Sequence, residues 1–252
     1  MIETAKEAAR EGGKIVLKHY DQDSCYVKDD GSIVCSADKK AEARIQEIIH
    51  GRYPEHRVVG EENGCNGKHE YCWYIDPLDG TTNFRNNLKD CAVSVGLAHK
   101  GRFILGAICN PFTDELFWAE RGKGAFLNGN KIRVNNIPAS EGVSVVLSSF
   151  RGRKESKLKF LDRWTDICPR IYTVGSAALQ FARFAQGWYI MSFQDKLKPW
   201  DFAAGVVIAE EAGGIVIDEH GEEPNPGSKN IISANSKELS EKAVEIIKGI
   251  YQ

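Results

Sequence analysis

The sequence has no long apolar run and no excess of positive charge. Its 252 residues contain nothing close to the roughly 20 apolar residues of a membrane-spanning helix. Charged residues such as Glu3, Lys6 and Arg10 replace the apolar core of a signal peptide. The 33 Lys and Arg against 35 Asp and Glu leave a net charge of −2, whereas nucleic-acid-binding domains carry a basic surplus. We therefore expect a cytoplasmic protein that binds neither membranes nor nucleic acid.

The sequence also lacks a CxxC pair, although it contains seven cysteines. An odd number of thiols without paired spacing argues against a disulfide framework and against a structural zinc site. Most of these cysteines stand beside apolar residues, which predicts buried free thiols. A reducing compartment agrees with that prediction.

A hydrophobic fraction of 42% beside 27% charged residues is typical of a folded globular protein. No internal repeat or low-complexity linker interrupts the chain, so we expect one domain over residues 1–252. Apolar residues three and four apart predict helices over 2–20 and 38–51, with Asp38 at the start of the second. Alternating apolar residues over 71–149 predict an antiparallel meander, with Asn128-Gly129 as a hairpin turn.

The second half alternates strands and helices. Strands are predicted near 143–148, 170–174, 188–193, 215–218 and 230–234, and helices near 156–167, 176–186 and 202–212, with a last helix capped by Asn235. The predicted fold class is therefore α/β, with layered helices and sheets. Two packed halves, about 1–140 and 141–252, are expected to meet near 138–142.

Residues 73–84, WYIDPLDGTTNF, carry the strongest chemical signal. A strand delivers Asp76 to its end, and Asp79 follows three residues later, so a tight loop brings both carboxylates to one point. Mg²⁺ prefers such oxygen ligands, often together with substrate phosphate. Gly80, Thr81 and Thr82 can present backbone N–H groups to a phosphate at a helix start. An Asx turn is the alternative interpretation for each short piece alone.

Two other segments place acidic residues at the ends of elements. Glu61 and Glu62 follow the apolar pair Val58-Val59, where an exposed polar loop is the alternative. Asp201 heads an apolar helix, where an ordinary N-cap is the alternative.

Taken in order, these segments resemble the inositol monophosphatase family of Mg²⁺-dependent, lithium-sensitive phosphatases. The matching motifs are GEE at 60–62, DPLDGTTNF at 76–84 and WDFAAGVVIAEEAGG at 200–214, and the stretches 110–129 and 174–187 are similar too. The resemblance runs from the first predicted helix to the last. It implies the sugar-phosphatase fold, an αβαβα sandwich, and a homodimer.

The resemblance also implies roles for individual residues. The metal ligands would be the carboxylates of Glu61, Asp76, Asp79 and Asp201 and the backbone carbonyl of Leu78. Gly80 and Thr81 would bind phosphate through backbone N–H groups, and Asp38 with Thr81 would orient and deprotonate the attacking water. Two or three Mg²⁺ ions would offset the repulsion between four carboxylates and a phosphate dianion.

Substrate choice is expected to come from residues around the leaving group. By resemblance these are Gly175, Ser176, Ala177, Gln194 and Asp201. Inositol-binding members carry Glu where this chain has Gln194, and a neutral amide binds a hydroxyl less strongly than a carboxylate does.

Several substrates and one binding role stay open. A small sugar or polyol phosphate is expected, first inositol 1-phosphate and then fructose 1,6-bisphosphate, whose second phosphate could meet Lys196 and Lys198. Histidinol phosphate is an alternative substrate. A non-catalytic role in transcription complexes is a further alternative, for which the basic run at 151–154 offers the only support.

Overall fold

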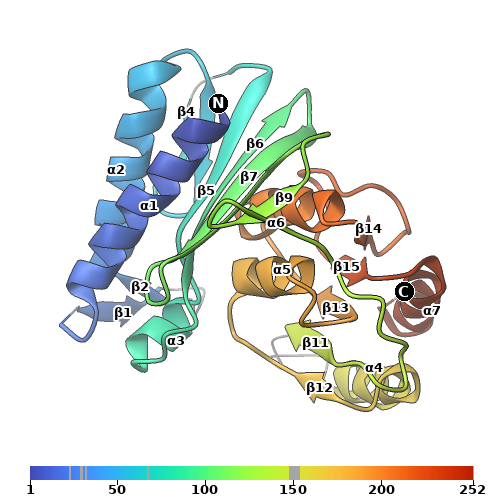
Figure 1. Cartoon of the computed structure of the whole chain (residues 1–252). Coiled ribbons are helices and arrows are strands. Elements are labelled where there is room, and N and C mark those ends of the chain that lie inside the picture. Colours follow the sequence, from blue (N-terminus) through green and yellow to red (C-terminus); the bar gives the residue numbers. More distant parts are fainter. Residues whose placement is uncertain (23, 29–30, 32, 67, 148–153, 252) are drawn as a thin grey trace.

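Five layers cross the molecule in the order helices, sheet, helices, sheet, helices (Figure 1). The computed structural model describes residues 1–252 apart from residues 23, 29–30, 32, 67, 148–153 and 252. The layering is the α/β sandwich predicted from the sequence. In the described residues, no helix has both the length and the apolar composition needed to cross a bilayer.

The first layer consists of α1 (Ile2–His19) and α2 (Ser36–Arg52), which pack on each other and on the larger sheet. The buried face of α1 includes Ala5, Ala9 and Gly12, as the predicted stripe requires. A Cβ added at Gly12 would lie 2.8 Å from Cδ1 of Ile45 on α2. The small residues of α1 therefore set how closely the two helices approach.

The larger sheet has eight strands in the order β10-β9-β8-β7-β6-β5-β3-β4. Their bounds are β3 (Arg57–Gly60), β4 (Gly64–Asn66), β5 (Tyr71–Asp79), β6 (Ala92–His99), β7 (Arg102–Asn110), β8 (Glu115–Glu120), β9 (Ala125–Leu127) and β10 (Asn130–Ile132). From β5 to β10 each strand is antiparallel to the next, which confirms the predicted meander. Asn128 and Gly129 turn from β9 to β10 with φ of 48° and 84°, as a type I′ turn requires.

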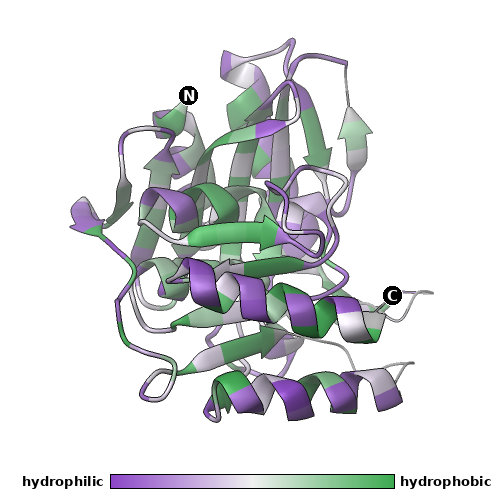
Figure 2. Cartoon of the chain, turned by 90° about the vertical axis from the view of Figure 1, so that its right-hand side faces the viewer, coloured by the Kyte–Doolittle hydropathy of each residue, from purple (hydrophilic) through white to green (hydrophobic). Residues whose placement is uncertain are grey.

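The smaller sheet has five strands in the order β12-β11-β13-β15-β14. Their bounds are β11 (Ser144–Leu147), β12 (Ile171–Tyr172), β13 (Met191–Gln194), β14 (Ile215–Asp218) and β15 (Ile231–Ala234). Outside it lie α4 (Lys154–Ile167) and α7 (Lys237–Tyr251), which carry both hydrophilic and hydrophobic residues along their length (Figure 2). Phe160 and Trp164 of α4 pack with Phe193 of β13 in the core beneath these helices.

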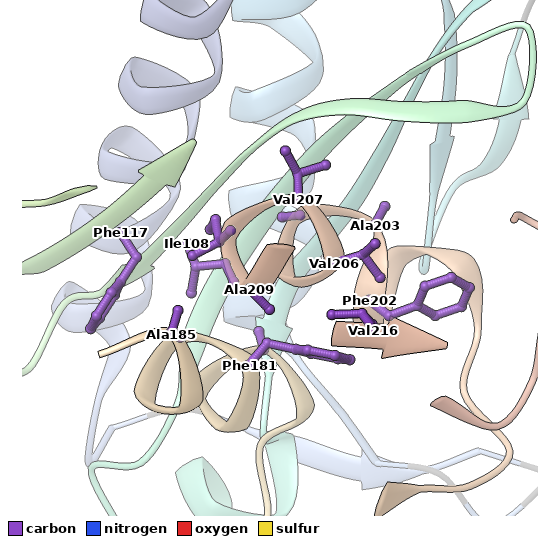
Figure 3. Close-up of a cluster of buried hydrophobic side chains, with 14 of the residues drawn as sticks. Ile108, Phe117, Phe181, Ala185, Phe202, Ala203, Val206, Val207, Ala209 and Val216 are labelled. Carbon is purple, nitrogen blue, oxygen red and sulfur yellow. The ribbon is translucent and has the colours of Figure 1, made fainter. Parts of the chain in front are cut away.

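Between the two sheets lie α5 (Ala177–Ala185) and α6 (Pro199–Glu211), whose apolar side chains form a shared core (Figure 3). Gly96 of β6 and Gly106 of β7 are directly opposite each other in the sheet, and α6 lies across them. A Cβ at Gly96 would lie 2.6 Å from Cβ of Ala203, and one at Gly106 would overlap the backbone of Ala204. These two glycines therefore fix the height of α6 above the sheet.

Three short elements lie together at one end of the larger sheet: β1 (Cys25–Val27), β2 (Ile33–Cys35) and α3 (Thr81–Arg85) (Figure 1). Cys25 and Cys35 form a disulfide, so the expectation of no disulfide was wrong for this pair. The antiparallel register of β1 and β2 places the two residues directly opposite each other, which their spacing in the sequence does not reveal. Of the other cysteines, Cys65 is an exposed free thiol, and the rest are buried free thiols: Cys72, Cys91, Cys109 and Cys168.

Some predicted boundaries differ from the observed ones. Strand β5 continues through a β-bulge to Asp79 instead of ending at Asp76. Helix α6 begins two residues before Asp201. The side chain that caps α7 is Ser236, whose Oγ accepts from the Leu239 N–H at 3.4 Å, while Asn235 bonds to the loop at Asn135 and Ile137.

The predicted joint near 138–142 falls between the last strand of the larger sheet and the first strand of the smaller one. That the whole chain forms one domain with two packed halves stays a prediction. Helix α6, from the second half, packs on strands of the first half.

We predict that Gly106→Ala destabilises the protein by about 1–3 kcal/mol, because the new methyl group forces α6 away from the sheet. Chemical denaturation followed by circular dichroism measures this loss. The control is Gly51→Ala on α2, where an added Cβ meets nothing within 4 Å, and which should stabilise by about 0.4–1 kcal/mol. Equal stability of the Gly106 variant and the wild type would contradict the packing described.

Candidate active site

Strand register brings Glu61 beside Asp76. Strands β3 and β5 are parallel, with Gly60 opposite Ile75, so the next residue of each strand is an acid. The backbone N–H of Glu61 donates to the carbonyl of Ile75 at 3.3 Å. Because Glu61 follows β3 directly and Asp76 is the neighbouring position on the parallel strand β5, before its bulge, their carboxylates act on each other.

A second link brings Asp201 to the same region. Asp76 is paired with Ser94 of β6, and the hydroxyl of Ser94 donates to the carbonyl of Trp200 at 3.4 Å. Asp201 is the third residue of α6, and its Oδ2 accepts from the backbone N–H of Lys198 at 2.7 Å. The packing of α6 on the sheet thus places the first turn of this helix above β5 and β6.

The carboxylates of Glu61, Asp76, Asp79 and Asp201 act on one another electrostatically. Burial, followed by the charge of Glu62, raises the pKa of Glu61 to about 7. Burial and the charges of Glu61, Asp79 and Asp201 raise the pKa of Asp76 well above its usual range. Burial likewise raises the pKa of Asp201, with Asp79 and Glu61 adding to the rise. Asp76 is only 2% exposed, so solvent does little to screen this repulsion.

Asp79 has a structural task as well. Its Oδ2 accepts from the Ser176 hydroxyl and from the Ala178 N–H (2.8 Å), and its Oδ1 accepts from the Ala177 N–H (3.1 Å). These donors lie at the N-terminus of α5, where an anion is stabilised. Burial still raises the pKa of Asp79, to about 6, against the lowering effect of those hydrogen bonds. The same contacts place Ser176 and Ala177 next to the acidic group.

Hydrogen bonds between side chains and backbone within the turn after Asp76 stabilise this turn. Oδ1 of Asp76 accepts from the Leu78 N–H at 3.0 Å, and the Thr81 hydroxyl donates to the Leu78 carbonyl at 3.0 Å. Gly80 adopts φ of 89° at the N-cap of α3, and a Cβ there would lie 2.9 Å from the carbonyl of Asp90. Only glycine combines this conformation with this space.

Asp38 is fully buried at the third position of α2. Its Oδ2 accepts from the Cys35 N–H at 2.9 Å, and its Oδ1 has no hydrogen-bond partner among the described residues. Burial, with added repulsion from Glu61 and Glu62, raises the pKa of Asp38 to about 8. The hydroxyl of Thr81, the other residue expected to act on the water, donates to the Leu78 carbonyl and not to Asp38.

Two residues that contact this site, Lys28 and Glu42, were not identified from the sequence. Lys28 forms a 2.6 Å ion pair with Glu62, and Glu61 and Asp38 also contribute to raising the pKa of this lysine, against the lowering by its burial. The carboxylate of Glu42 accepts from the backbone N–H groups of Glu62 (2.8 Å) and Asn63 (2.9 Å) and so supports the loop after β3. Lys28 lies in a polar stretch without periodicity, and Glu42 looks like an ordinary helix residue, so neither gives a local signal.

The residues predicted to contact the leaving group lie in two parts of the structure, the loop at Gly175 and the end of β13 at Gln194. Gly175, with φ of 76°, packs against the side chain of Asn83, whose Nδ2 donates to the carbonyls of Val174 (2.7 Å) and Asp90 (2.8 Å). This joins the Gly175 loop to α3. Gln194 ends β13 as a fully buried residue, and neither polar atom of its amide has a hydrogen-bond partner among the described residues.

The residue after Gln194 belongs to a buried ion pair. Asp195 lies 3.3 Å from Nζ of Lys157 on α4, and both side chains are 1% exposed. Lys196 and Lys198 are exposed and line a depression of about 380 Å³ together with Lys229. The basic run at 151–154 falls mainly outside the described residues.

No three Asp, Glu, His or Cys side chains in the described part of the chain are arranged as a finished metal-binding cluster. Asp76, Asp79 and Asp201 each direct an oxygen to backbone N–H groups. The available donors are carboxylate oxygens and the Leu78 carbonyl, and such hard oxygen donors fit Mg²⁺ better than a thiophilic metal.

Known proteins are similar to this chain over most of its length. The model of the inositol monophosphatase family matches residues 1–252. The fructose-1,6-bisphosphatase/inositol-1-monophosphatase of Aquifex aeolicus is 36% identical over 222 residues, which cover 85% of this chain and 84% of that protein.

Two bacterial SuhB proteins are also similar. The Nus factor SuhB of Escherichia coli is 36% identical over 245 residues, covering 94% of this chain and 92% of that protein. The crystal structure of the extragenic suppressor protein suhB from Bartonella henselae superimposes with a TM-score of 0.92 at 32% identity, covering 98% of this chain and 97% of that one. The chain therefore belongs to the inositol monophosphatase family.

Proposed function

We propose that this chain is a Mg²⁺-dependent phosphomonoesterase that hydrolyses a small sugar or polyol phosphate. The observation that carries the proposal is the acidic group of Glu61, Asp76, Asp79 and Asp201. Glu61 follows β3, Asp76 and Asp79 lie on β5, and Asp201 is in the first turn of α6; the four carboxylates act on one another electrostatically. Such a buried group of like charges is unfavourable without cations.

The metal ligands in this proposal are the four carboxylates and the backbone carbonyl of Leu78. Bound Mg²⁺ would supply charge neutralisation for the phosphoryl oxygens and the leaving alkoxide. Lys28 and Lys198 partly offset the negative charge, but Lys28 is already paired with Glu62. Two or three Mg²⁺ ions fit the charge of the site.

The chain's own residues carry the remaining steps. The backbone N–H groups of Gly80 and Thr81 bind phosphate oxygens at the start of α3. The hydroxyl of Thr81 orients the attacking water, and the unpartnered Oδ1 of Asp38 accepts its proton. The raised pKa of Asp38, about 8, makes it a stronger base than an ordinary carboxylate once it is ionised.

The leaving group is proposed to lie between the Gly175 loop and the end of β13. Ser176 and Ala177 are next to Asp79, and the amide of Gln194 has unused donors and an unused acceptor. Inositol 1-phosphate fits these polar contacts. The name of the Aquifex relative favours fructose 1,6-bisphosphate as a second substrate, whose other phosphate would meet Lys196 and Lys198.

A second candidate function is a role in transcription complexes. The relatives named Nus factor SuhB are similar over 94% of this chain, which favours this role. We propose phosphatase activity first, because every carboxylate that the reaction requires is present. A cytoplasmic homodimer is proposed on the family resemblance.

We predict that the metal-free protein loses stability as the pH rises from about 5 to about 8, because the folded state holds protons that the unfolded carboxylates release at lower pH. Mg²⁺ should reverse this loss, because it favours the ionised carboxylates. At about 100 times its Kd it should stabilise by about 2.7 kcal/mol at about pH 8, and by much less at about pH 5. Thermal unfolding with Mg²⁺ or a chelator measures both effects.

The control variant for this experiment is Asp76→Asn. Asparagine keeps the acceptor for the Leu78 N–H and removes the charge that Glu61, Asp79 and Asp201 oppose. The metal-free variant should be more stable than the wild type at high pH and should gain less from Mg²⁺. A wild type that is indifferent to Mg²⁺ at every pH would rule out the metal site.

We predict that Thr81→Ala lowers kcat about 10²-fold and leaves the affinity for Mg²⁺ unchanged, because the hydroxyl positions water and holds no metal. Phosphate release measures kcat, and a Mg²⁺ titration measures affinity. The control is Thr82→Ala at the exposed next residue, which should behave like the wild type. A weaker Mg²⁺ affinity with unchanged kcat would show that Thr81 does not orient the water.

The proposed activity is tested with inositol 1-phosphate, fructose 1,6-bisphosphate and histidinol phosphate in parallel, each with Mg²⁺. We predict turnover of inositol 1-phosphate, and an increase in its kcat/KM of about tenfold in Gln194→Glu, where a carboxylate strengthens a hydroxyl contact. Lys196→Ala should affect only the bisphosphate. Asp76→Asn is the inactive control, and no phosphate release from any substrate would refute the proposal.

A further inference from the structure

The disulfide between Cys25 and Cys35 lies at the edge of the candidate active site. Cys35 is the N-cap residue of α2, three residues before Asp38, and Cys25 is opposite it on β1. The two strands have three residues each, and a two-stranded sheet of this length is marginal on its own. The covalent bond is therefore a major restraint on this hairpin.

The two sulfur atoms have unequal surroundings. Cys25 is half-buried and lines a depression of about 300 Å³ together with Asp21, Phe84, Arg85 and Asn87, so a thiol can reach it from solvent. Cys35 is 0% exposed. It is the N-cap residue of a helix of 17 residues.

That position favours Cys35 as the leaving sulfur. A helix N-terminus stabilises a thiolate, and a stabilised thiolate leaves faster in thiol–disulfide exchange. Access and leaving-group stability therefore agree on one direction, with attack at Cys25 and release of Cys35.

We propose that Cys25–Cys35 is a reversible redox site that exchanges with a protein dithiol. The attacking thiolate forms a mixed disulfide with Sγ of Cys25, and Sγ of Cys35 leaves as a thiolate that takes up one proton. The second thiolate of the partner then attacks the partner's first sulfur in the mixed disulfide. This step releases Cys25 as a thiolate, which also takes up one proton. The partner becomes a disulfide, two electrons reduce the Cys25–Cys35 bond, and the reverse sequence restores it.

Reduction of the disulfide is expected to affect the candidate active site through two contacts of the hairpin. The N–H of Cys35 donates to Asp38, and Lys28, one residue beyond β1, pairs with Glu62 beside the acidic group. Without the covalent bond, the hairpin opens more often and both contacts weaken. The predicted loss of turnover rests on the proposed function, whereas the exchange chemistry does not.

The first test counts thiols in the folded protein. The protein is incubated with a reduced CxxC dithiol protein, alkylated without denaturation, and analysed by peptide mass spectrometry. We expect alkylation of Cys25 and Cys35 only after reduction, of exposed Cys65 in both states, and of none of the four buried cysteines. Reoxidation should remove the new labels. Labelling of both residues before reduction, or of neither after it, would overturn the proposal.

The second test separates the redox site from the phosphatase. Cys25→Ser removes the disulfide and keeps the N-cap residue of α2, and Cys65→Ser is the matched control. In the reduced protein and in Cys25→Ser, we expect faster backbone hydrogen exchange over the described residues between 24 and 35 than in the oxidised wild type. We also expect kcat/KM to be about tenfold lower than in the oxidised wild type. Unchanged exchange would overturn the proposal, whereas changed exchange in a protein without phosphatase activity would refute only the proposed function.

Discussion

Repulsion among buried carboxylates is the constraint on which this structure depends. Burial raises the pKa values of Glu61, Asp76, Asp79 and Asp201, and for all of them except Asp79 the like charges of neighbouring carboxylates add to the rise. No local interaction would gather them, so packing elsewhere has to supply the free energy. The contact of α6 with the glycines of β6 and β7 is one such source, since it places Asp201 above β5. If the site binds Mg²⁺ as proposed, the protein gives up stability in the metal-free state for cation binding.

Each aspartate of the site accepts a hydrogen bond from a nearby backbone N–H group. Asp38 and Asp201 use the same device, because each is the third residue of a helix and accepts from the N–H of its N-cap residue. Asp76 accepts from Leu78 within its own turn, and Asp79 accepts from the start of α5. These bonds satisfy at least one oxygen of each carboxylate and fix its direction. For Asp38 the other oxygen is left without a partner and becomes the obvious place for a proton.

Features set by short sequence patterns could be predicted, and features set by packing could not. The two acids in the first turns of α2 and α6, the Asn128-Gly129 hairpin and the α/β class follow from local spacing and periodicity, whereas the order of the layers followed from the family resemblance. The Cys25–Cys35 bond and the buried Lys157–Asp195 pair do not, because each joins segments whose proximity depends on the finished fold. The double role of Asp79 was missed for the same reason, since its partners on α5 are almost 100 residues away. The family resemblance selected the acidic residues, and the sheet register gives the physical reason why two of them meet.

The most direct test of the central claim is a crystal structure of the protein with Mn²⁺ and inorganic phosphate, with Mn²⁺ located by its anomalous scattering. The account predicts anomalous peaks among the oxygens of Glu61, Asp76, Asp79 and Asp201 and the Leu78 carbonyl, with phosphate against the Gly80 and Thr81 N–H groups. It also predicts that Asp201 and Asp76 rotate toward the ions from their present hydrogen bonds. Saturating Mn²⁺ with no peak within bonding distance of these side chains would contradict it.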